Sequence, residues 1–407
     1  MADIELSSTE PRPPALSLPA LFLRFLKFGL LAFGGPVAQI AMLRRELVDE
    51  ERWLSSARFN RLLAVMQVLP GPEAHELCVH LGMRARGRLG GVLAGLGFML
   101  PGFVLMMALS WLYFRLDFDR SWVGAVLLGV QAGVVALIIR AVHRIGEHVL
   151  QDGWLWAVAL GSAAATLMGF SFWLVLPLGG AVHALARSGR RVIAAGLGLT
   201  GAAAAGLLAL GAEAAAPLAF VQSAATRPGD VAAWVLFLAG LKAGLLTFGG
   251  AYTAIPFLRE DSVRRGWMGD AQFLDGLALS GVLPAPLIIF STFVGYVAGG
   301  PWGAAAITAG IFLPAFAFSL IFYDRLEAVL ENVRLHALLE GVAAAVVGLI
   351  AVTAGQLAWG LLAEAERRWI VAAILSAALA AIYLWRAKLA SPVILLAAGV
   401  TGAALLA

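Results

Sequence analysis

Charged residues and cysteine are scarce in this chain. Asp, Glu, Lys and Arg make up 13% of its 407 residues, whereas hydrophobic residues make up 61%. A soluble fold of this length needs more charge on its surface, so this composition excludes a soluble protein. The single cysteine, Cys78, excludes an internal disulfide and a multi-cysteine metal site. The net charge of +4 comes from arginines in short loops, which suits anionic lipid headgroups better than nucleic acid.

Apolar sequence is abundant. The mean hydropathy is +0.88, and apolar runs near the ~20 residues needed to cross a bilayer recur from end to end. The sequence therefore predicts an all-α polytopic membrane protein with about 10 to 13 membrane segments. Residues 1–17 are acidic and proline-rich and lack the basic start and apolar core of a signal peptide. We expect a short disordered cytoplasmic tail there.

Lysine is the rarest charged residue, and its positions reveal an internal repeat. The chain has three lysines, and two of them, Lys27 and Lys242, each stand seven residues before a pair of glycines. The match extends to Trp53 and Trp267 and to several paired motifs, so chance is a poor explanation. We divide the chain into the tail 1–17, a first membrane repeat 18–186, a connector 187–230 with a linking membrane segment, and a second membrane repeat 231–407.

Loop charge predicts that the two repeats have opposite orientations in the membrane. The arginine-rich segment Arg84–Arg88 corresponds to the uncharged Gly299–Trp302. Conversely, the uncharged Gly169–Ser171 corresponds to a segment that contains Arg386 and Lys388. Six spans in each repeat and a seventh in the connector would turn the second copy upside down. Because the face richer in Arg and Lys is usually cytoplasmic, we expect Arg84–Arg88 in the cytoplasm.

Helix-breaking residues interrupt two successive apolar segments in each repeat. Such breaks free backbone N–H and C=O groups that lipid cannot satisfy, so they persist where protein or a hydrated cavity serves them. Each new half-helix begins with amides that carry a partial positive charge. Discontinuous helices at corresponding positions of inverted halves indicate a transport site near the membrane midplane, with simple kinking or close helix packing as the alternative. The breaks are Gly34-Gly35-Pro36, Pro70-Gly71-Pro72, Gly249-Gly250 and Pro284-Ala285-Pro286.

Basic residues near the breaks favour an anion as the ligand. Lys27 and Lys242 lie about two turns, roughly 10 Å, before the glycines on the same helix face. Arg44 and Arg259 follow the breaks, and each has an acid two positions later. Together with the freed amides, these donors predict a site for a small oxyanion. Snorkelling of the lysines to the interface and solvation of the arginines in loops are the alternatives.

Ionisable residues follow the second break in the first repeat only. Glu73, His75 and Glu76 come directly after Pro72, and His80 lies one turn further on. Ionisable groups within a membrane segment indicate a proton relay. The alternative is an acid that its helix N-terminus stabilises, on a helix face that emerges towards the arginines. The corresponding residues of the second repeat are apolar: Leu287, Ile289, Phe290 and Val294.

Four motifs together resemble the chromate ion transporter family. The resemblance covers both repeats. It implies two homologous halves of opposed orientation in the bacterial inner membrane, which export chromate, with sulfate as a structural relative. The sequence departs from the family pattern at Ala285, where a second Pro-Gly-Pro is usual, and at His75-Glu76, where a Thr-Gln pair is more typical. The motifs are Phe33-Gly34-Gly35-Pro36, Leu69-Pro70-Gly71-Pro72-Glu73-Ala74, Leu100-Pro101-Gly102-Phe103 and Phe248-Gly249-Gly250.

The residues by themselves argue only for a small oxyanion, so a sulfate or organic-anion carrier is compatible with the sequence. An intramembrane enzyme is less compatible, because no His/Asp/Glu metal spacing and no nucleophile elbow occur. A structural or sensory membrane protein has no use for repeated polar breaks. We therefore expect a transporter without cofactor, metal or catalytic residues. Its expected partners are the bilayer, the oxyanion and protons as coupling ion, and a homodimer is compatible with the sequence.

Overall fold

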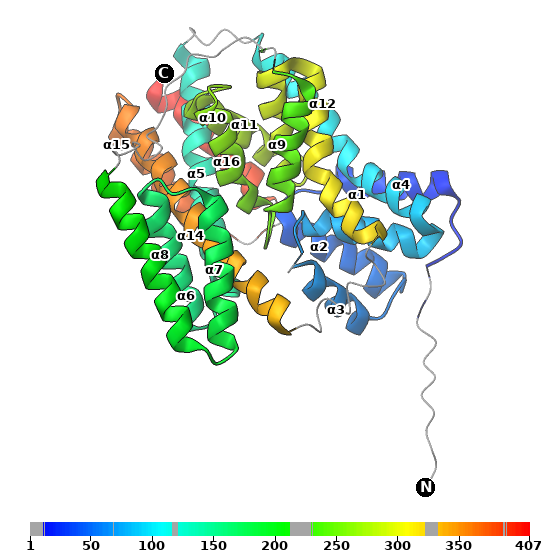
Figure 1. The fold of residues 1–407 in the computed structure, drawn as a ribbon. Coiled ribbons are helices and arrows are strands. Elements are labelled where there is room, and N and C mark those ends of the chain that lie inside the picture. Colours follow the sequence, from blue (N-terminus) through cyan, green and yellow to red (C-terminus); the bar gives the residue numbers. More distant parts are fainter. Residues whose placement is uncertain are drawn as a thin grey trace.

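The computed structural model describes residues 11, 13–67, 69–115, 121–211, 229, 231–321, 333–385, 387 and 389–407. Arg386, Lys388 and most of the expected N-terminal tail lie outside the described residues, as does much of the connector. The described residues form helices and loops and contain no strand. The prediction of an all-α fold is therefore confirmed, and Figure 1 shows the helices packed side by side in one body.

The helices of the two repeats follow in the same order, with α8 (Arg191–Gly211) between them. Among the described residues, two 3-10 turns, η2 and η3, occur in the second repeat only, and a π-helical turn, η1, in the first repeat only. The first repeat contains α1 (Leu18–Leu30), α2 (Gly35–Arg44), η1 (Arg45–Glu50), α3 (Ser56–Met66), α4 (Glu73–Tyr113), α5 (Ser121–Val149), α6 (Gly153–Leu167) and α7 (Phe172–Arg187). The second contains α9 (Ala233–Leu245), η2 (Ala251–Ala254), α10 (Ile255–Arg264), α11 (Asp270–Val282), η3 (Leu287–Ile289), α12 (Phe290–Ile321), α14 (Val333–Glu364), α15 (Arg368–Leu384) and α16 (Ala390–Leu406).

The long helices α4 and α12 each fold back into a hairpin. The turn in α4 has φ −143° and ψ 31° at Arg86, followed by φ 63° and ψ −161° at Gly87. The turn in α12 has nearly the same geometry, φ −145° and ψ 24° at Gly299 and φ 62° and ψ −157° at Gly300. Positive φ favours glycine at the second position of both turns. The arginine-rich segment and its uncharged counterpart are therefore the tips of two equivalent hairpins.

The second arms of these hairpins, residues 88–113 and 301–321, pack against each other. A Cβ on Gly91 would lie 2.7 Å from Leu320, and one on Gly95 would lie 2.5 Å from Phe316. Early residues of one arm thus meet late residues of the other, so the two arms run antiparallel.

The two repeats are interlocked through their remaining helices. Helix α5 of the first repeat packs against α15 and α16 of the second, and α14 of the second packs against α6 and α7 of the first. Figure 1 shows α5 beside α16 and α14 beside α6 and α7. The largest buried core therefore contains helices of both repeats, whereas a second core lies within residues 21–98 of the first repeat.

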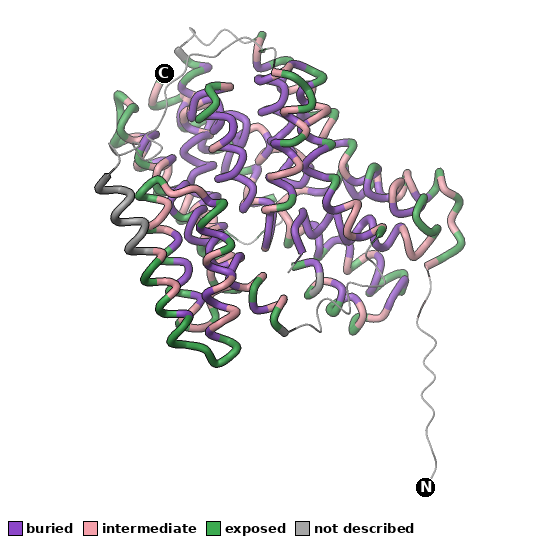
Figure 2. Tube along the Cα trace, viewed as in Figure 1, coloured by how far each residue is buried: buried purple, intermediate pink, exposed green. Residues whose placement is uncertain are grey.

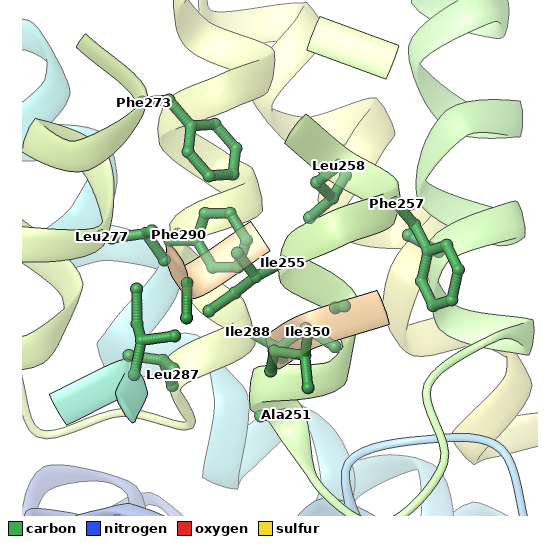
Figure 3. Packing of buried hydrophobic residues seen from close by; sticks show 14 of the residues in the cluster. Ala251, Ile255, Phe257, Leu258, Phe273, Leu277, Leu287, Ile288, Phe290 and Ile350 are labelled. Carbon is green, nitrogen blue, oxygen red and sulfur yellow. The ribbon is translucent and has the colours of Figure 1, made fainter. Parts of the chain in front are cut away.

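The buried core joins both repeats, while the outer helices present large apolar side chains to the surroundings. Figure 2 shows buried residues gathered around α5, α11 and α12, and Figure 3 shows side chains of α10, α11, η3 and α12 meeting in the second repeat. Trp156 of α6, Trp173 of α7 and Trp359 of α14 are exposed, as expected of helices that face lipid. Among the described residues, four helices are long and apolar enough to cross a membrane, and six shorter apolar helices accompany them.

Small residues allow the hairpins to approach their neighbours, and Gly310 tests this packing. A Cβ on Gly310 would lie 2.2 Å from the backbone oxygen of Phe237 in α9. We expect Gly310→Ala to force α9 and α12 apart and to destabilise the protein by about 1–3 kcal/mol. The matched control is Gly355→Ala, because a Cβ at that helical glycine has no atom within 4 Å. Thermal unfolding in detergent measures both, and equal shifts would contradict the packing role.

Candidate functional site

The first break of each repeat is a glycine pair in left-handed backbone conformations. Gly34 and Gly35 have φ of +85° and +77°, and Gly249 and Gly250 have φ of +73° and +121°. A Cβ on Gly35 or Gly250 would meet no atom within 4 Å, so both glycines border open space. Side chains other than glycine are strained at such φ values. The glycines are therefore required by the backbone conformation, and they leave the space beside them empty. Pro36 occupies the first turn of α2, where it needs no N–H partner.

The second break differs between the repeats at its central residue. Gly71, between Pro70 and Pro72, has φ of +145°, and a Cβ on it would lie 2.5 Å from the carboxylate of Glu76. Ala285, between Pro284 and Pro286, does not take a positive φ, and its N–H donates instead to the carbonyl of Leu283 at 3.0 Å.

The structure brings the four breaks together in two pairs, and each pair joins the two repeats. The N–H of Gly71 donates to the carbonyl of Thr247 at 2.9 Å, which links the second break of the first repeat to the first break of the second repeat. The other pair is joined by Gln39 of α2. Its Nε2 donates to the carbonyl of Ala32 at 2.9 Å and to that of Ala285 at 3.1 Å. Gln39 belongs to none of the sequence motifs, although it lies in the first turns after a break.

Helix N-termini accompany these junctions. Helix α2 begins at Gly35 and α4 begins at Glu73, and no side chain caps either start. The first amides of an uncapped helix have no intrahelical acceptor and carry a partial positive charge. The junctions therefore combine open glycine surfaces with hydrogen-bond donors, which is the chemistry that binds an oxyanion.

Each repeated lysine is paired with an acid nineteen residues further on. Lys242 Nζ lies 2.5 Å from Asp261 Oδ2 and 5.1 Å from the ring centroid of Phe172. Lys27 Nζ lies 3.8 Å from Glu46 Oε2. The side chain of Lys27 is 60% exposed, whereas that of Lys242 is 17% exposed. The equal spacing in both repeats is the signal that would have predicted these pairs. Helices α1 and α9 end at Leu30 and Leu245, so each lysine lies in the last turn of its helix. The expectation that two helical turns separate the lysine from the glycines is therefore wrong, because the backbone leaves the helix before it reaches them.

The two arginines of the predicted site have different surroundings. Arg259 is 1% exposed, and Asp270 accepts from its Nε at 2.5 Å and from its Nη2 at 3.1 Å. Its Nη1 donates to Gln356 at 2.7 Å. Arg44 is only partly buried, donates to Asn60 at 3.3 Å and lies over the ring of Phe59. Arg259 is thus held by internal partners, whereas Arg44 has weaker ones.

The ionisable residues after the second break are buried at the start of α4. Glu73 is 7% exposed, and His75 and Glu76 are fully buried. The His75 ring packs edge-on against Phe312 and Phe316 of α12. Neither carboxylate oxygen of Glu76 has a hydrogen-bond partner in the described part of the chain. Buried acids are usually paired, so the unpaired Glu76 beside Gly71 is a candidate for a functional role.

A further buried acid, Asp275, lies outside the sequence motifs. Asp275 of α11 is 5% exposed and accepts from the Tyr113 hydroxyl at 2.8 Å and from Gln131 Nε2 at 2.7 Å. Tyr113 ends α4 and Gln131 lies on α5, so this cluster also joins the repeats. Its residues belong to no shared motif, and only the fold brings them together.

Comparison with known proteins identifies the family. The sequence model of the chromate transporter family matches residues 19–185 and 234–403. The chain is 64% identical to the chromate transport protein of Pseudomonas aeruginosa, over 97% of this chain and 94% of that protein. It is 31% identical to the chromate transport protein of Cupriavidus metallidurans, over 96% and 93% of the two chains. No solved structure matches. The match in both repeats, together with relatives aligned over nearly their whole length, shows that the chain belongs to the chromate transporter family.

Proposed function

We propose that this protein is a secondary active transporter that exports a small oxyanion, chromate, across the bacterial inner membrane. The observation that carries the proposal is the convergence of the four helix breaks in two junctions between the repeats. The relatives named as chromate transport proteins favour chromate over other oxyanions. In this proposal the anion binds beside Gly34, Gly35, Gly249 and Gly250, and the second breaks line the same site.

The basic residues supply charge to the path of the anion. Lys27 and Lys242 are each neutralised by an acid in the structure, so a dianion that reaches the lysine competes with that acid. Arg44 has neutral and aromatic partners and is the arginine more readily available to an anion. Arg259 contributes to the site by fixing α10 against α11 and α14.

We further propose that the repeats have inverted orientations. The antiparallel contact between the equivalent arms of α4 and α12 supports this, because equivalent helices related by an axis along the membrane normal would run parallel. Inverted repeats around one site are the usual basis of alternating access, in which each half rocks against the other.

Proton coupling is assigned to the first repeat. Glu73, His75 and Glu76 are buried beside the Pro70–Pro72 break, and Glu76 lacks a hydrogen-bond partner among the described residues. The second repeat has Leu287, Ile289 and Phe290 at these positions, all buried. One half of the site can therefore exchange protons while the other provides an apolar wall.

Flux measurements on purified protein in proteoliposomes test the function. We expect uptake of labelled chromate into inside-out vesicles, competition by sulfate, and acceleration by a proton gradient. Glu76→Gln should still transport but should no longer respond to the gradient, because the amide cannot exchange a proton. Wild-type vesicles that take up neither chromate nor sulfate would refute the proposal.

The ion pairs predict opposite effects on chromate binding for variants of the lysine and variants of the acid. Lys242→Gln should weaken chromate binding by about 2–5 kcal/mol, because the bound dianion loses a desolvated partner. Lys27→Gln should have a smaller effect, since that side chain is largely exposed. Lys242→Arg should rescue only in part, because a planar guanidinium does not replace a compact ammonium. Asp261→Asn should strengthen binding, because it removes the competing carboxylate.

Equilibrium binding to purified variants measures these effects, and Arg264→Gln is the control because its exposed pair with Glu260 lies outside the proposed path. Equal, small effects at Lys27, Lys242 and Arg264 would show that the lysines are not part of the site.

The inverted orientation predicts that the two hairpin tips lie on opposite sides of the membrane. Single cysteines at Arg88→Cys and Trp302→Cys, in a Cys78→Ser background, place a thiol on each exposed tip. We expect an impermeant thiol reagent to label the first from the cytoplasm and the second from the periplasm. Labelling of both from one side would contradict inversion.

A further inference from the structure

The two junctions between the breaks are equivalent in position but differ in chemistry. Gly71 and Ala285 occupy the same position of the repeat, and so do Thr247 and Ala32. In one junction, a backbone N–H from Gly71 reaches the carbonyl of Thr247 directly. In the other, the corresponding N–H of Ala285 points to Leu283, and the carbonyl of Ala32 accepts from the side chain of Gln39 instead.

The difference follows from the residue at the centre of the second break. Gly71 directs its N–H across the junction from a backbone with φ of +145°. Alanine is strained in that region because of its Cβ, and Ala285 keeps a negative or extended φ. Its N–H is turned away, so the Ala32 carbonyl would be left without a donor at the junction. A buried carbonyl without a donor is unfavourable, most of all within a membrane.

Glycine and alanine also exchange places between the two junctions. Gly71 faces the methyl group of Ala315, whereas Ala285 faces Gly102, and Gly102 and Ala315 are again equivalent positions. A Cβ on Gly102 would lie 2.5 Å from the Ala285 methyl group. Each junction therefore holds one methyl group. It belongs to Ala285 of the break in one junction and to Ala315 of the facing helix in the other. The absence of a side chain at Gly102 leaves room for the Ala285 methyl group.

Gln39 supplies the hydrogen-bond donor that Ala285 does not provide at this junction. The side chain is 1% exposed, and its equivalent in the second repeat is Ala254, which faces a junction that needs no extra donor. Both N–H groups of Nε2 are used, while its Oε1 is buried without a partner in the described part of the chain. Burying an amide with one unsatisfied atom is unfavourable. The two hydrogen bonds that Nε2 donates are therefore the reason for a glutamine at this position.

We propose that Gln39 is a positioning residue of the anion site, whose side-chain amide replaces the backbone N–H that Ala285 turns away. It holds the carbonyls of Ala32 and Ala285 at the junction and thereby sets the orientation of the Gly34-Gly35 turn. This inference rests on the proposed function only in taking the junction as part of the anion site.

Rescue by a second substitution tests the inference. Gln39→Met keeps the length of the side chain and removes both donors. We expect it to reduce the apparent affinity for chromate by about 10-fold, the effect of two lost hydrogen bonds. Ala285→Gly should restore most of the loss, because a glycine can turn its N–H to the Ala32 carbonyl as Gly71 does to that of Thr247. The measurements are chromate flux, separated into KM and maximal rate, and the Tm in detergent.

Gln131→Met is the matched control, because Gln131 also bridges the repeats with two donated hydrogen bonds, to Ala271 and Asp275, away from the breaks. Ala285→Gly should not rescue it. If Gln39→Met lowers the Tm as Gln131→Met does and leaves the KM for chromate unchanged, Gln39 has only a structural role and the inference is wrong.

The inference and the proposed function fail differently. If wild-type protein transports chromate but Ala285→Gly does not rescue Gln39→Met, the inference fails alone. If wild-type protein transports no oxyanion, the proposed function fails, and the Tm of the single and double variants still reports whether Gln39 replaces the N–H of Ala285. Should Gln39→Met not reach the membrane, recovery of folded protein by Ala285→Gly supports the replacement, and continued absence overturns it.

Discussion

The structure depends on satisfying backbone groups at helix breaks within a membrane protein. Lipid offers no hydrogen bonds, so each break needs a partner inside the protein. Here the breaks of one repeat are satisfied by the breaks of the other, through the Gly71 N–H and through Gln39. The interlocked packing of α5 and α14, and the close approach of α4 and α12, hold the two repeats in the register that this pairing requires. A site made in this way belongs to neither repeat alone.

The two repeats have a similar backbone arrangement but carry different ionisable side chains. The first repeat places Glu73, His75 and Glu76 at the start of α4, whereas the second places apolar residues at the same positions. The lysine of the pair is exposed in the first repeat, whereas both lysine and acid are largely buried in the second. The two repeats provide similar backbone frames that carry different side chains at these positions. This difference is what the proposed proton coupling through the first repeat requires.

The local features of the fold were predictable from sequence because they depend on local rules. Glycine and proline positions located all four breaks, since backbone geometry is decided by neighbouring residues. Hydropathy predicted an all-α membrane protein, and the structure confirms the helical fold. The family resemblance is also confirmed. The division of the chain at residues 18, 187 and 231 and the individual site residues stay predictions.

Long-range partners were not predictable in the same way. Glu46 and Asp261 follow Arg44 and Arg259 in the sequence, whereas the structure pairs them with Lys27 and Lys242. Glu46 also pairs with Arg24, and Asp261 with Arg265. Gln39 and Asp275 have no motif around them, and their importance appears only when residues distant in the chain are brought together. An internal repeat offers one remedy, because a spacing that recurs in both copies, such as lysine to acid, is a constraint on tertiary contacts.

The exchange of helices between the repeats also bears on biogenesis. During synthesis α5 leaves the ribosome long before α15 and α16, which cover it in the finished protein. Until α15 and α16 are inserted, α5 of the first repeat lacks these packing partners in the bilayer. Final assembly therefore follows insertion of the whole chain. Contacts between segments so far apart in sequence form slowly. Truncation near the C-terminus would then also uncover α5 in the N-terminal half of the chain.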